Sequence, residues 1–286
     1  MIELTAAAMR QMFPHAPTAI FADLAEWQAH FDAAGITATR TRLAYCCANM
    51  AQETGCFTIR NLTESIAYSA ARACQVWPNR FRAPDDCYRK IGSYPGDPQF
   101  GRKLIDSVYG GRMGNRPGTS DGSRFVGRGA PQVTGRDGYR NAGRRCGLDL
   151  ENRPELAAAP ENQAKVMAAF WTWKNLNAKA DLGDFRGAVR VWNGGAVGLA
   201  ERQRYLARFT PIIKTLPGTA SPATPPKAVV DRATGGERRT AVAGAAGTAQ
   251  PGKLLAYPLA GLGIVLVVVA VVALARKRAA LIANWR

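Results

Sequence analysis

Apolar side chains recur every three or four residues in four parts of the chain, which is the spacing of one face of an α-helix. Turn-forming residues bound these parts: Pro17-Thr18 and Pro160-Glu161 precede the first and third, and Gly35, Gly55 and Gly194-Gly195 follow the first, second and fourth. The pattern predicts a mainly helical fold. The four sets are Ile20, Leu24, Trp27 and Phe31; Leu43, Cys47 and Met50; Val166, Phe170 and Trp173; and Leu182, Phe185, Val189 and Trp192.

The helical spacing is lost between residues 91 and 138, where glycine and proline become frequent. We predict loops with short strands there, one of them within residues 124–134. Gln132 and Thr134 alternate along this strand, so an amide and a hydroxyl would point to the same side. The predicted fold class is therefore mainly α, with a small irregular or β insertion that makes it α+β.

Residues 254–275 form an apolar segment without a charged side chain. At ~1.5 Å per residue this helix would span ~33 Å, enough to cross a bilayer core of ~30 Å. Basic residues at 276–278 follow it, which predicts a cytoplasmic C-terminus. The N-terminal segment resembles no signal peptide, since Glu3 and Arg10 interrupt it. We therefore predict a single-pass protein of the bacterial inner membrane, with its catalytic or binding domain facing the periplasm.

Composition divides the chain into four parts. Residues 1–209 are predicted to be globular. Residues 210–253 are rich in proline, alanine, glycine and threonine and contain no aromatic residue, which is typical of a flexible linker. The predicted membrane helix, 254–275, and a basic tail, 276–286, complete the chain.

The chain carries a formal net charge of +17. This excess favours an anionic partner, such as nucleic acid, an acidic membrane or a cell-wall polymer. We expect no nucleic-acid binding, because no helix-turn-helix or RNA-binding motif is present. Six cysteines without a Cys-x-x-Cys pair and only two histidines predict no metal site, and we expect no cofactor. The cysteines are expected to be small buried thiols or to form one or two disulfides.

Two glutamates are the first candidates for chemistry. Glu53 lies at the end of the helix that Gly55 terminates, and Glu64 lies on the following loop. Two carboxylates at one cleft can cleave a glycosidic bond, because one protonates the leaving oxygen and the other activates water. The alternative is that both are solvated surface residues.

Glycine-rich segments are the second source of candidates. Repeated glycines in YGGRMGN (109–115) and GRGAPQVTG (127–135) let the backbone approach a ligand closely. No Gly-Lys-Ser/Thr follows them, so they are not phosphate loops. The segment WNGG (192–195) predicts a helix end, followed by a second helix that contains Arg202.

Together, five ordered segments resemble glycoside hydrolase family 19, the chitinase-like enzymes, and especially their phage endolysin branch. They are AQETGCF, NLTESIAYSA, YGGRMGN, GRGAPQVTG, and WNGG with the trailing Arg202, and the resemblance covers about residues 1–209. It implies a lysozyme-like helical fold with two lobes around a cleft, and an inverting mechanism. The acid should have a raised pKa and the base should stay ionised.

The resemblance also implies a role for each candidate residue. Glu53 matches the general acid, Glu64 the general base, and Thr134 the hydroxyl that helps to hold the water. The positions that match sugar-binding or carboxylate-organising residues are Gln132, Asn193, Arg202 and Tyr68.

Three positions depart from the family pattern: Gln52 replaces a histidine, Pro131 an aliphatic residue and Gly138 an asparagine. These changes affect substrate preference more than the reaction. The leading hypothesis is therefore an endolysin-type hydrolase that cuts β-1,4 bonds of peptidoglycan and lyses the cell wall. The alternatives are a chitinase and a non-catalytic, membrane-tethered wall-binding protein.

Overall fold

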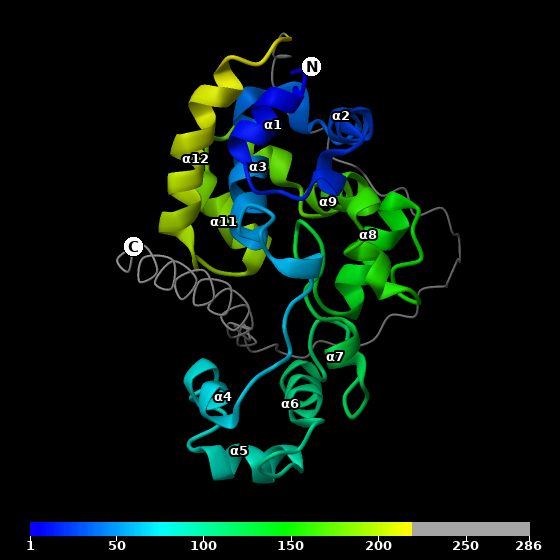
Figure 1. Cartoon of the computed structure of the whole chain (residues 1–286), viewed down its shortest axis with the longest axis vertical. Coiled ribbons are helices and arrows are strands. Elements are labelled where there is room, and N and C mark those ends of the chain that lie inside the picture. Colours follow the sequence, from blue (N-terminus) through cyan, green and yellow to red (C-terminus); the bar gives the residue numbers. More distant parts are fainter. Residues whose placement is uncertain (219–286) are drawn as a thin grey trace, which may run out of the picture.

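The computed structural model describes residues 1–218, and helices dominate them (Figure 1). The α-helices are α1 (Ala6–Met12), α2 (Leu24–Ala33), α3 (Arg40–Thr54), α4 (Ala70–Val76), α5 (Pro84–Ile91), α6 (Phe100–Tyr109), α7 (Asp121–Arg124), α8 (Arg136–Cys146), α9 (Gln163–Trp173), α10 (Leu176–Asp181), α11 (Phe185–Asn193) and α12 (Leu199–Lys214). Short 3-10 helices lie at η1 (Thr18–Phe21), η2 (Ile36–Ala38), η3 (Arg60–Leu62), η4 (Pro154–Ala157) and η5 (Pro160–Asn162). The prediction of a mainly helical class is confirmed.

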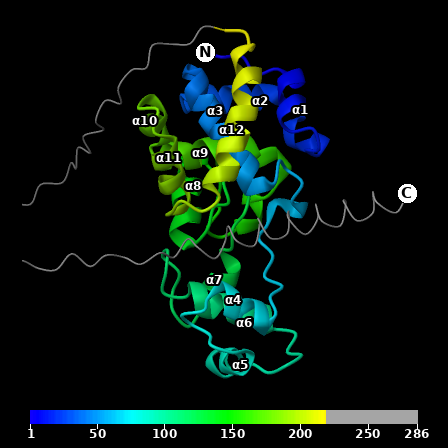
Figure 2. The ribbon, with the colours of Figure 1, turned by 90° about the vertical axis from the view of Figure 1, so that its left-hand side faces the viewer.

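The described residues form two lobes of unequal size. The larger contains α1–α3 and α8–α12, and the smaller contains α4–α6 with α7 at the junction (Figures 1 and 2). Each lobe has its own apolar core; the core of the small lobe includes Phe81, Phe100, Leu104 and Val108. Because the two cores are separate, the segments that join the lobes can carry polar groups between them.

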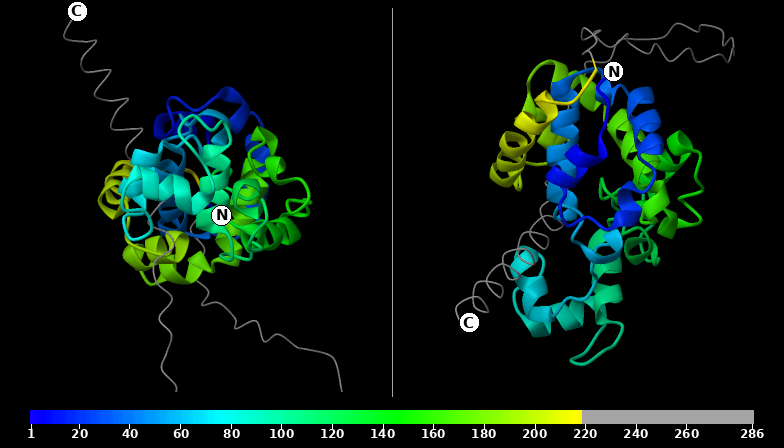
Figure 3. Two further views of the ribbon diagram at one scale, coloured as in Figure 1. Left: turned by 90° about the horizontal axis from the view of Figure 1, so that it is seen from below. Right: turned by 45° about the horizontal axis from the view of Figure 1, so that its top comes forward.

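Helix α3 lies at the centre of the large lobe and packs against α12 (Figure 3). The hydroxyl of Thr39 accepts a hydrogen bond from the N–H of Arg42 at its start, and Gly55 ends it in the left-handed region. The apolar residues Leu43, Cys47 and Met50 are fully buried, as the spacing predicts. Polar residues of the last turns are buried too, which sets up the site described below.

An aromatic contact fixes the chain where it leaves α3. Phe57 has a positive φ of 63° and is almost completely buried. Its ring centroid lies 5.4 Å from that of Phe13 and 5.3 Å from that of Phe21. This packing stabilises a backbone conformation that a phenylalanine rarely adopts.

Two of the predicted helices differ from the structure at one end. The first is split, because Asp23 caps α2 by accepting a hydrogen bond from the N–H of Glu26, which leaves Ile20 on η1. Leu182 lies between α10 and α11 and is 78% exposed, so it is not part of the face of α11. Asp184 caps α11 two residues later.

The region predicted to contain strands is in fact partly helical. Helix α6 places Phe100, Leu104 and Val108 on one buried face, a four-residue spacing that the glycines around it obscure. The described residues contain isolated bridges between Thr63 and Arg128 and between Arg128 and Val133 in place of a strand within 124–134. Gln132 has a φ of 55° and lies in a turn, so the predicted strand alternation is wrong.

No helix in residues 1–218 combines the length and apolar character needed to cross a membrane. This finding corrects the predicted localisation as a single-pass inner-membrane protein. The predicted membrane helix 254–275, the basic tail 276–286 and most of the predicted linker lie outside the described residues. The linker boundary at 209 is also too early, because α12 continues to Lys214 and Leu216 is buried.

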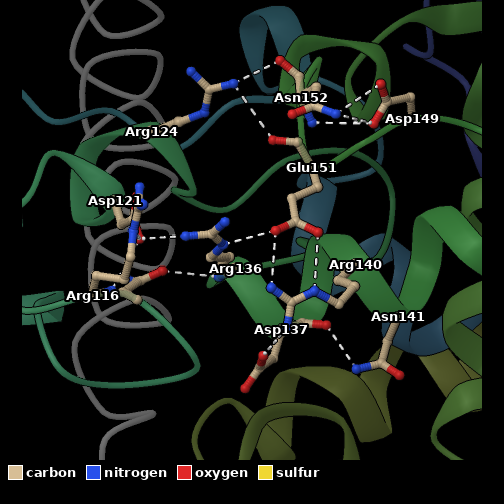
Figure 4. A network of polar contacts seen from close by, with 11 residues as sticks. Arg116, Asp121, Arg124, Arg136, Asp137, Arg140, Asn141, Asp149, Glu151 and Asn152 are labelled. Carbon is tan, nitrogen blue, oxygen red and sulfur yellow. Dashed lines mark hydrogen bonds and ion pairs between the residues drawn. The ribbon is translucent and has the colours of Figure 1, made fainter.

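A network of arginines and carboxylates joins α7 to α8 and to the turn at residues 149–152 (Figure 4). Arg136 and Arg140 donate to the carboxylate of Glu151 at 2.8–2.9 Å. Arg136 also contacts Asp121 at 3.4 Å, and Asp121 pairs with Arg116 at 2.9 Å. Hydrogen bonds from Arg140 and Arg136 lower the pKa of Glu151 to about 2.

Replacing Glu151 should weaken the fold in a pH-dependent way. Glu151→Gln should lower the free energy of unfolding by about 1–2 kcal/mol at pH 7, because two charge-assisted contacts are lost. The depressed pKa means that this stabilisation is complete above pH ~4.5 and disappears as the pH falls towards 2. Urea unfolding at pH 7 and pH 3 measures both effects.

Glu155→Gln provides the matched control, because the Glu155 pair with Arg153 is two-thirds exposed on both sides. Its unfolding free energy should change by less than about 0.5 kcal/mol. Equal losses in the two variants would contradict a special role for Glu151.

Candidate active site

Glu53 belongs to a buried ion pair between α3 and α12. Arg202 is fully buried, and its Nη2 donates to Oε1 of Glu53. The Nη1 of Arg202 donates to Oδ1 of Asn49 at 2.7 Å. Asn49 precedes Glu53 by four residues, so both lie on the face of α3 that meets α12. The guanidinium therefore offsets the cost of burying the carboxylate and fixes its direction.

Hydrogen bonds fix the orientation of the Asn49 side chain towards Arg202. Its side-chain amide donates to the carbonyl of Tyr45 at 2.8 Å, which leaves its oxygen to face Arg202. Asn49 is itself fully buried. The side chain thus links the backbone of α3 to the guanidinium that holds Glu53.

Glu64 lies in the segment that joins the two lobes and is half-buried. The backbone N–H of Gly127 donates to its Oε2 at 3.0 Å, and the hydroxyl of Tyr109 donates to its Oε1 at 3.2 Å. The N–H of Glu64 in turn donates to the carbonyl of Gly127 at 2.8 Å. One backbone N–H and one side-chain hydroxyl therefore hold the carboxylate, and a second contact to Gly127 holds the backbone of Glu64.

Burial raises the pKa of Glu64, while the hydrogen bonds from Gly127 and Tyr109 and the charge of Arg128 act in the opposite direction. We expected the acid, Glu53, to be the carboxylate with a raised pKa. The raised pKa that the structure shows belongs to Glu64, the predicted base. The physical reason is that Glu64 lacks a direct ion pair among the described residues, and three weaker influences oppose its desolvation.

Gln132 and Thr134 lie next to Gly127. A methyl group at Gly127 would lie 2.6 Å from Oε1 of Gln132 and 3.3 Å from Oγ1 of Thr134, so it would displace the Gln132 side chain. Gln132 donates to the carbonyl of Gly129 at 3.1 Å, and Thr134 donates to the carbonyl of Gln132 at 3.0 Å. Since Gly127 also binds Glu64, the structure brings Glu64, Gln132 and Thr134 to one place.

Tyr68 and Asn193 make contacts of their own, and of the two only Tyr68 responds to the charge of Glu64. The ring of Tyr68 packs on Trp77 at a centroid distance of 5.2 Å, and its buried hydroxyl has no hydrogen-bond partner in the described part of the chain. Burial, followed by the charge of Glu64, raises the pKa of Tyr68. Asn193 uses its side chain in the turn after α11, where it bonds Val197 and Gly195. Its amide therefore shapes the approach to α12.

Sequence comparison gives the decisive observation. A glycosyl hydrolase family 19 domain-containing protein of Haemophilus influenzae is 30% identical over 193 residues, which cover 67% of this chain and 88% of that protein. The chain belongs to glycosyl hydrolase family 19. It is therefore a glycoside hydrolase, and the recognition of the family from its five segments is confirmed.

Comparison with other proteins gives one further sequence match and two structural similarities for this family 19 hydrolase. An acidic 27 kDa endochitinase of Solanum lycopersicum is 41% identical over 108 residues, 35% of this chain and 43% of that protein. The structure of chitinase C from Streptomyces griseus has a TM-score of 0.48 at 19% identity, over 77% of this chain and 96% of that one. A chitinase C mutant gives 0.49 at 18% identity, over 76% and 79%. No family model matches the chain.

Three residues around the carboxylates of this family 19 hydrolase were not predicted from the sequence to belong to the site. Tyr109 and Gly127 lie within segments that the sequence singles out, but only as glycine-rich turns. Asn49 carries a weak signal, because a polar residue four positions before Glu53 falls on the same helix face. Its partner, Arg202, is 153 residues away, so the contact itself is invisible in the local pattern.

Removing Arg202 should be costly, because it would leave Glu53 buried without its counter-charge. Arg202→Met should lower the free energy of unfolding by about 3–5 kcal/mol. Arg204→Met is the matched control on the same helix, since the Arg204 pair with Glu201 is exposed on the arginine side. Its effect should stay below about 1 kcal/mol. Denaturant unfolding followed by circular dichroism compares the two, and equal losses would contradict the assignment.

Proposed function

We propose that this family 19 hydrolase is an endolysin-type enzyme that cuts β-1,4 bonds in the glycan strands of bacterial peptidoglycan and so lyses the cell wall. The observation that carries the proposal is the setting of Glu64. Its carboxylate accepts from the backbone N–H of Gly127, and the side chains of Gln132 and Thr134 approach the same glycine. A base next to a hydroxyl is suited to hold and activate one water molecule.

The proposed reaction inverts the anomeric carbon. Glu53 donates its proton to the glycosidic oxygen, and the bond from that oxygen to the anomeric carbon breaks. Glu64 removes a proton from the water, whose oxygen bonds to the anomeric carbon from the opposite face. Thr134 already donates its own proton to Gln132, so its oxygen lone pairs are free to accept from this water. After the product leaves, Glu64 releases to solvent the proton that it took from the water, and Glu53 takes up a proton from solvent, which restores both groups.

The other candidate residues act on binding in this proposal. Arg202 orients Glu53, and Gln132, Asn193 and Tyr68 contact the sugars. The buried hydroxyl of Tyr68, which has no partner among residues 1–218, is a group that a sugar hydroxyl can satisfy.

Charge supports peptidoglycan as the substrate. Residues 1–209 contain 28 basic and 19 acidic residues. Nine arginines, no lysine and four acidic residues fall within 110–153. Peptidoglycan carries carboxylates on its stem peptides, whereas chitin is uncharged, and arginine is well suited to carboxylates. A basic hydrolase should therefore gain more affinity from the wall polymer.

Chitin is the second candidate substrate, and the similarity to the tomato endochitinase favours it. Turbidity loss of permeabilised Gram-negative cells, compared with sugar release from colloidal chitin, decides between the two. Faster chitin cleavage without lysis would overturn the peptidoglycan proposal and leave the hydrolase mechanism standing.

Both carboxylates should be required for lysis. Glu53→Gln and Glu64→Gln should each reduce the lysis rate by at least about 100-fold, since each removes a proton donor or acceptor. Glu161→Gln, an exposed glutamate on η5, should retain the parental rate. Circular dichroism checks that all three variants fold. Lysis at the parental rate by both active-site variants would refute the site.

The product should have the α configuration immediately after cleavage. Inversion at a β-1,4 bond produces the α-anomer, which then equilibrates slowly in water. Proton NMR of a short β-1,4-linked N-acetylglucosamine oligomer, recorded within minutes of adding enzyme, distinguishes the two anomers. Initial accumulation of the β-anomer would exclude Glu64 as a base that acts through water.

A further inference from the structure

The segment YGGRMGN begins with a tyrosine that the proposed mechanism does not yet use. Tyr109 ends α6, is buried in the core of the small lobe, and has an exposed fraction of only 2%. Its hydroxyl nevertheless reaches Oε1 of Glu64, which lies in the segment between the lobes, at 3.2 Å. The small lobe therefore contacts the candidate base directly.

The rest of the segment holds Tyr109 in place. The side-chain amide of Asn115 donates to the carbonyl of Tyr109 at 3.1 Å, and the N–H of Gly111 donates to the carbonyl of Asn115 at 3.0 Å. Asn115 is buried and its Oδ1 accepts from the N–H of Arg136, the first residue of α8, at 2.9 Å. The loop is thus tied to both lobes through one side chain.

Close packing requires glycine at two places, Gly114 in this loop and Gly135 just before α8. A methyl group at Gly114 would lie 2.3 Å from the carboxylate of Asp137, and one at Gly135 would lie 2.3 Å from Cβ of Met113. Both glycines also have a positive φ. The loop can therefore lie directly against the start of α8, which fixes the end of α6 and the tyrosine on it.

We propose that Tyr109 is a positioning residue that holds the carboxylate of Glu64 in its ionised, water-facing orientation. The inference rests on the proposed function, because it requires Glu64 to be the base. Gly127 holds one carboxylate oxygen from the backbone and Tyr109 holds the other, so rotation of the carboxylate is restricted. One lone pair of each oxygen remains for water.

The direction in which Tyr109 shifts the pKa of Glu64 follows from its role as the hydrogen-bond donor. A hydroxyl that donates to a carboxylate stabilises its charged form and lowers its pKa. Burial, followed by the charge of Glu64, raises the pKa of Tyr109 well above its ordinary value, so the tyrosine remains a donor at every working pH. The other titratable or charged groups that act on or respond to Glu64 are Arg128, Tyr68 and Tyr139.

Tyr109→Phe removes only the hydroxyl and tests the proposal. The acidic limb of the kcat/KM profile should move to higher pH by about one unit, because a hydrogen bond to a charged group is lost. At pH values below the shifted acidic limb, kcat of the variant should be roughly tenfold lower than that of the parent, while KM should change less than about twofold. Tyr88→Phe, on α5 of the same lobe, is the matched control and should keep the parental profile.

A second variant covers the case in which Tyr109→Phe does not fold. Incorporation of 3-fluorotyrosine at position 109 keeps the shape and strengthens the donor, so the acidic limb should move to lower pH. A parental pH profile in the folded variants, with Glu64→Gln inactive, would overturn this inference and leave the proposed function intact. Parental activity of Glu64→Gln would instead overturn the proposed function itself.

Discussion

The buried pair between Arg202 and Glu53 is the constraint on which the large lobe depends. Neither charge can be buried alone, because the desolvation cost of each is several kcal/mol and only the partner offsets it. The two residues are 149 positions apart, so the pair can form only when α12 has packed against α3. Helix α12 is therefore part of the candidate site. The helix continues to Lys214 and packs against α1, and the N–H of Glu3 donates to the carbonyl of Pro217 beyond its end.

The two carboxylates are held by different physical means. Glu53 is rigid and shielded, because a guanidinium fixes it inside the large lobe. Glu64 is half-buried and bound by neutral donors from Gly127 and Tyr109. Neutral donors restrain a carboxylate without cancelling its charge, so a water molecule nearby still experiences a base. An inverting glycosidase requires the higher pKa on its acid and an ionised base. In this structure the raised pKa belongs to Glu64, so the donors from Gly127 and Tyr109 are what favour its ionised form.

The sequence pattern predicted those helix ends that are determined by residues next to them in the chain. The ends of α3 and α11 follow from Gly55 and Gly194, both of which are in the left-handed region. The pattern failed where tertiary contacts override it. Helix α6 contains Gly101, which weakens the helical signal but is required because a methyl group there would lie 2.1 Å from the carbonyl of Ile66. Gln132 appeared to belong to a strand, yet the turn around it brings its amide to Gly127. The motif segments located Glu53 and Glu64, whereas their partners required the folded chain.

Tyr109 could not be identified from the sequence, because its contact with Glu64 is a tertiary one that the local pattern does not show. Its local environment is that of a core aromatic at a helix end, and its ring is buried among the side chains of the small lobe. The function proposed for it follows only from the position of the small lobe, because the hydroxyl meets a residue 45 positions earlier in the chain. The hydrogen bond from this lobe makes the protonation of the proposed base, Glu64, depend on the position of the lobe. Separation of the lobes would lengthen this bond and favour the protonated form of Glu64. The core of the small lobe is thus linked to the proposed chemistry through the hydroxyl group of Tyr109.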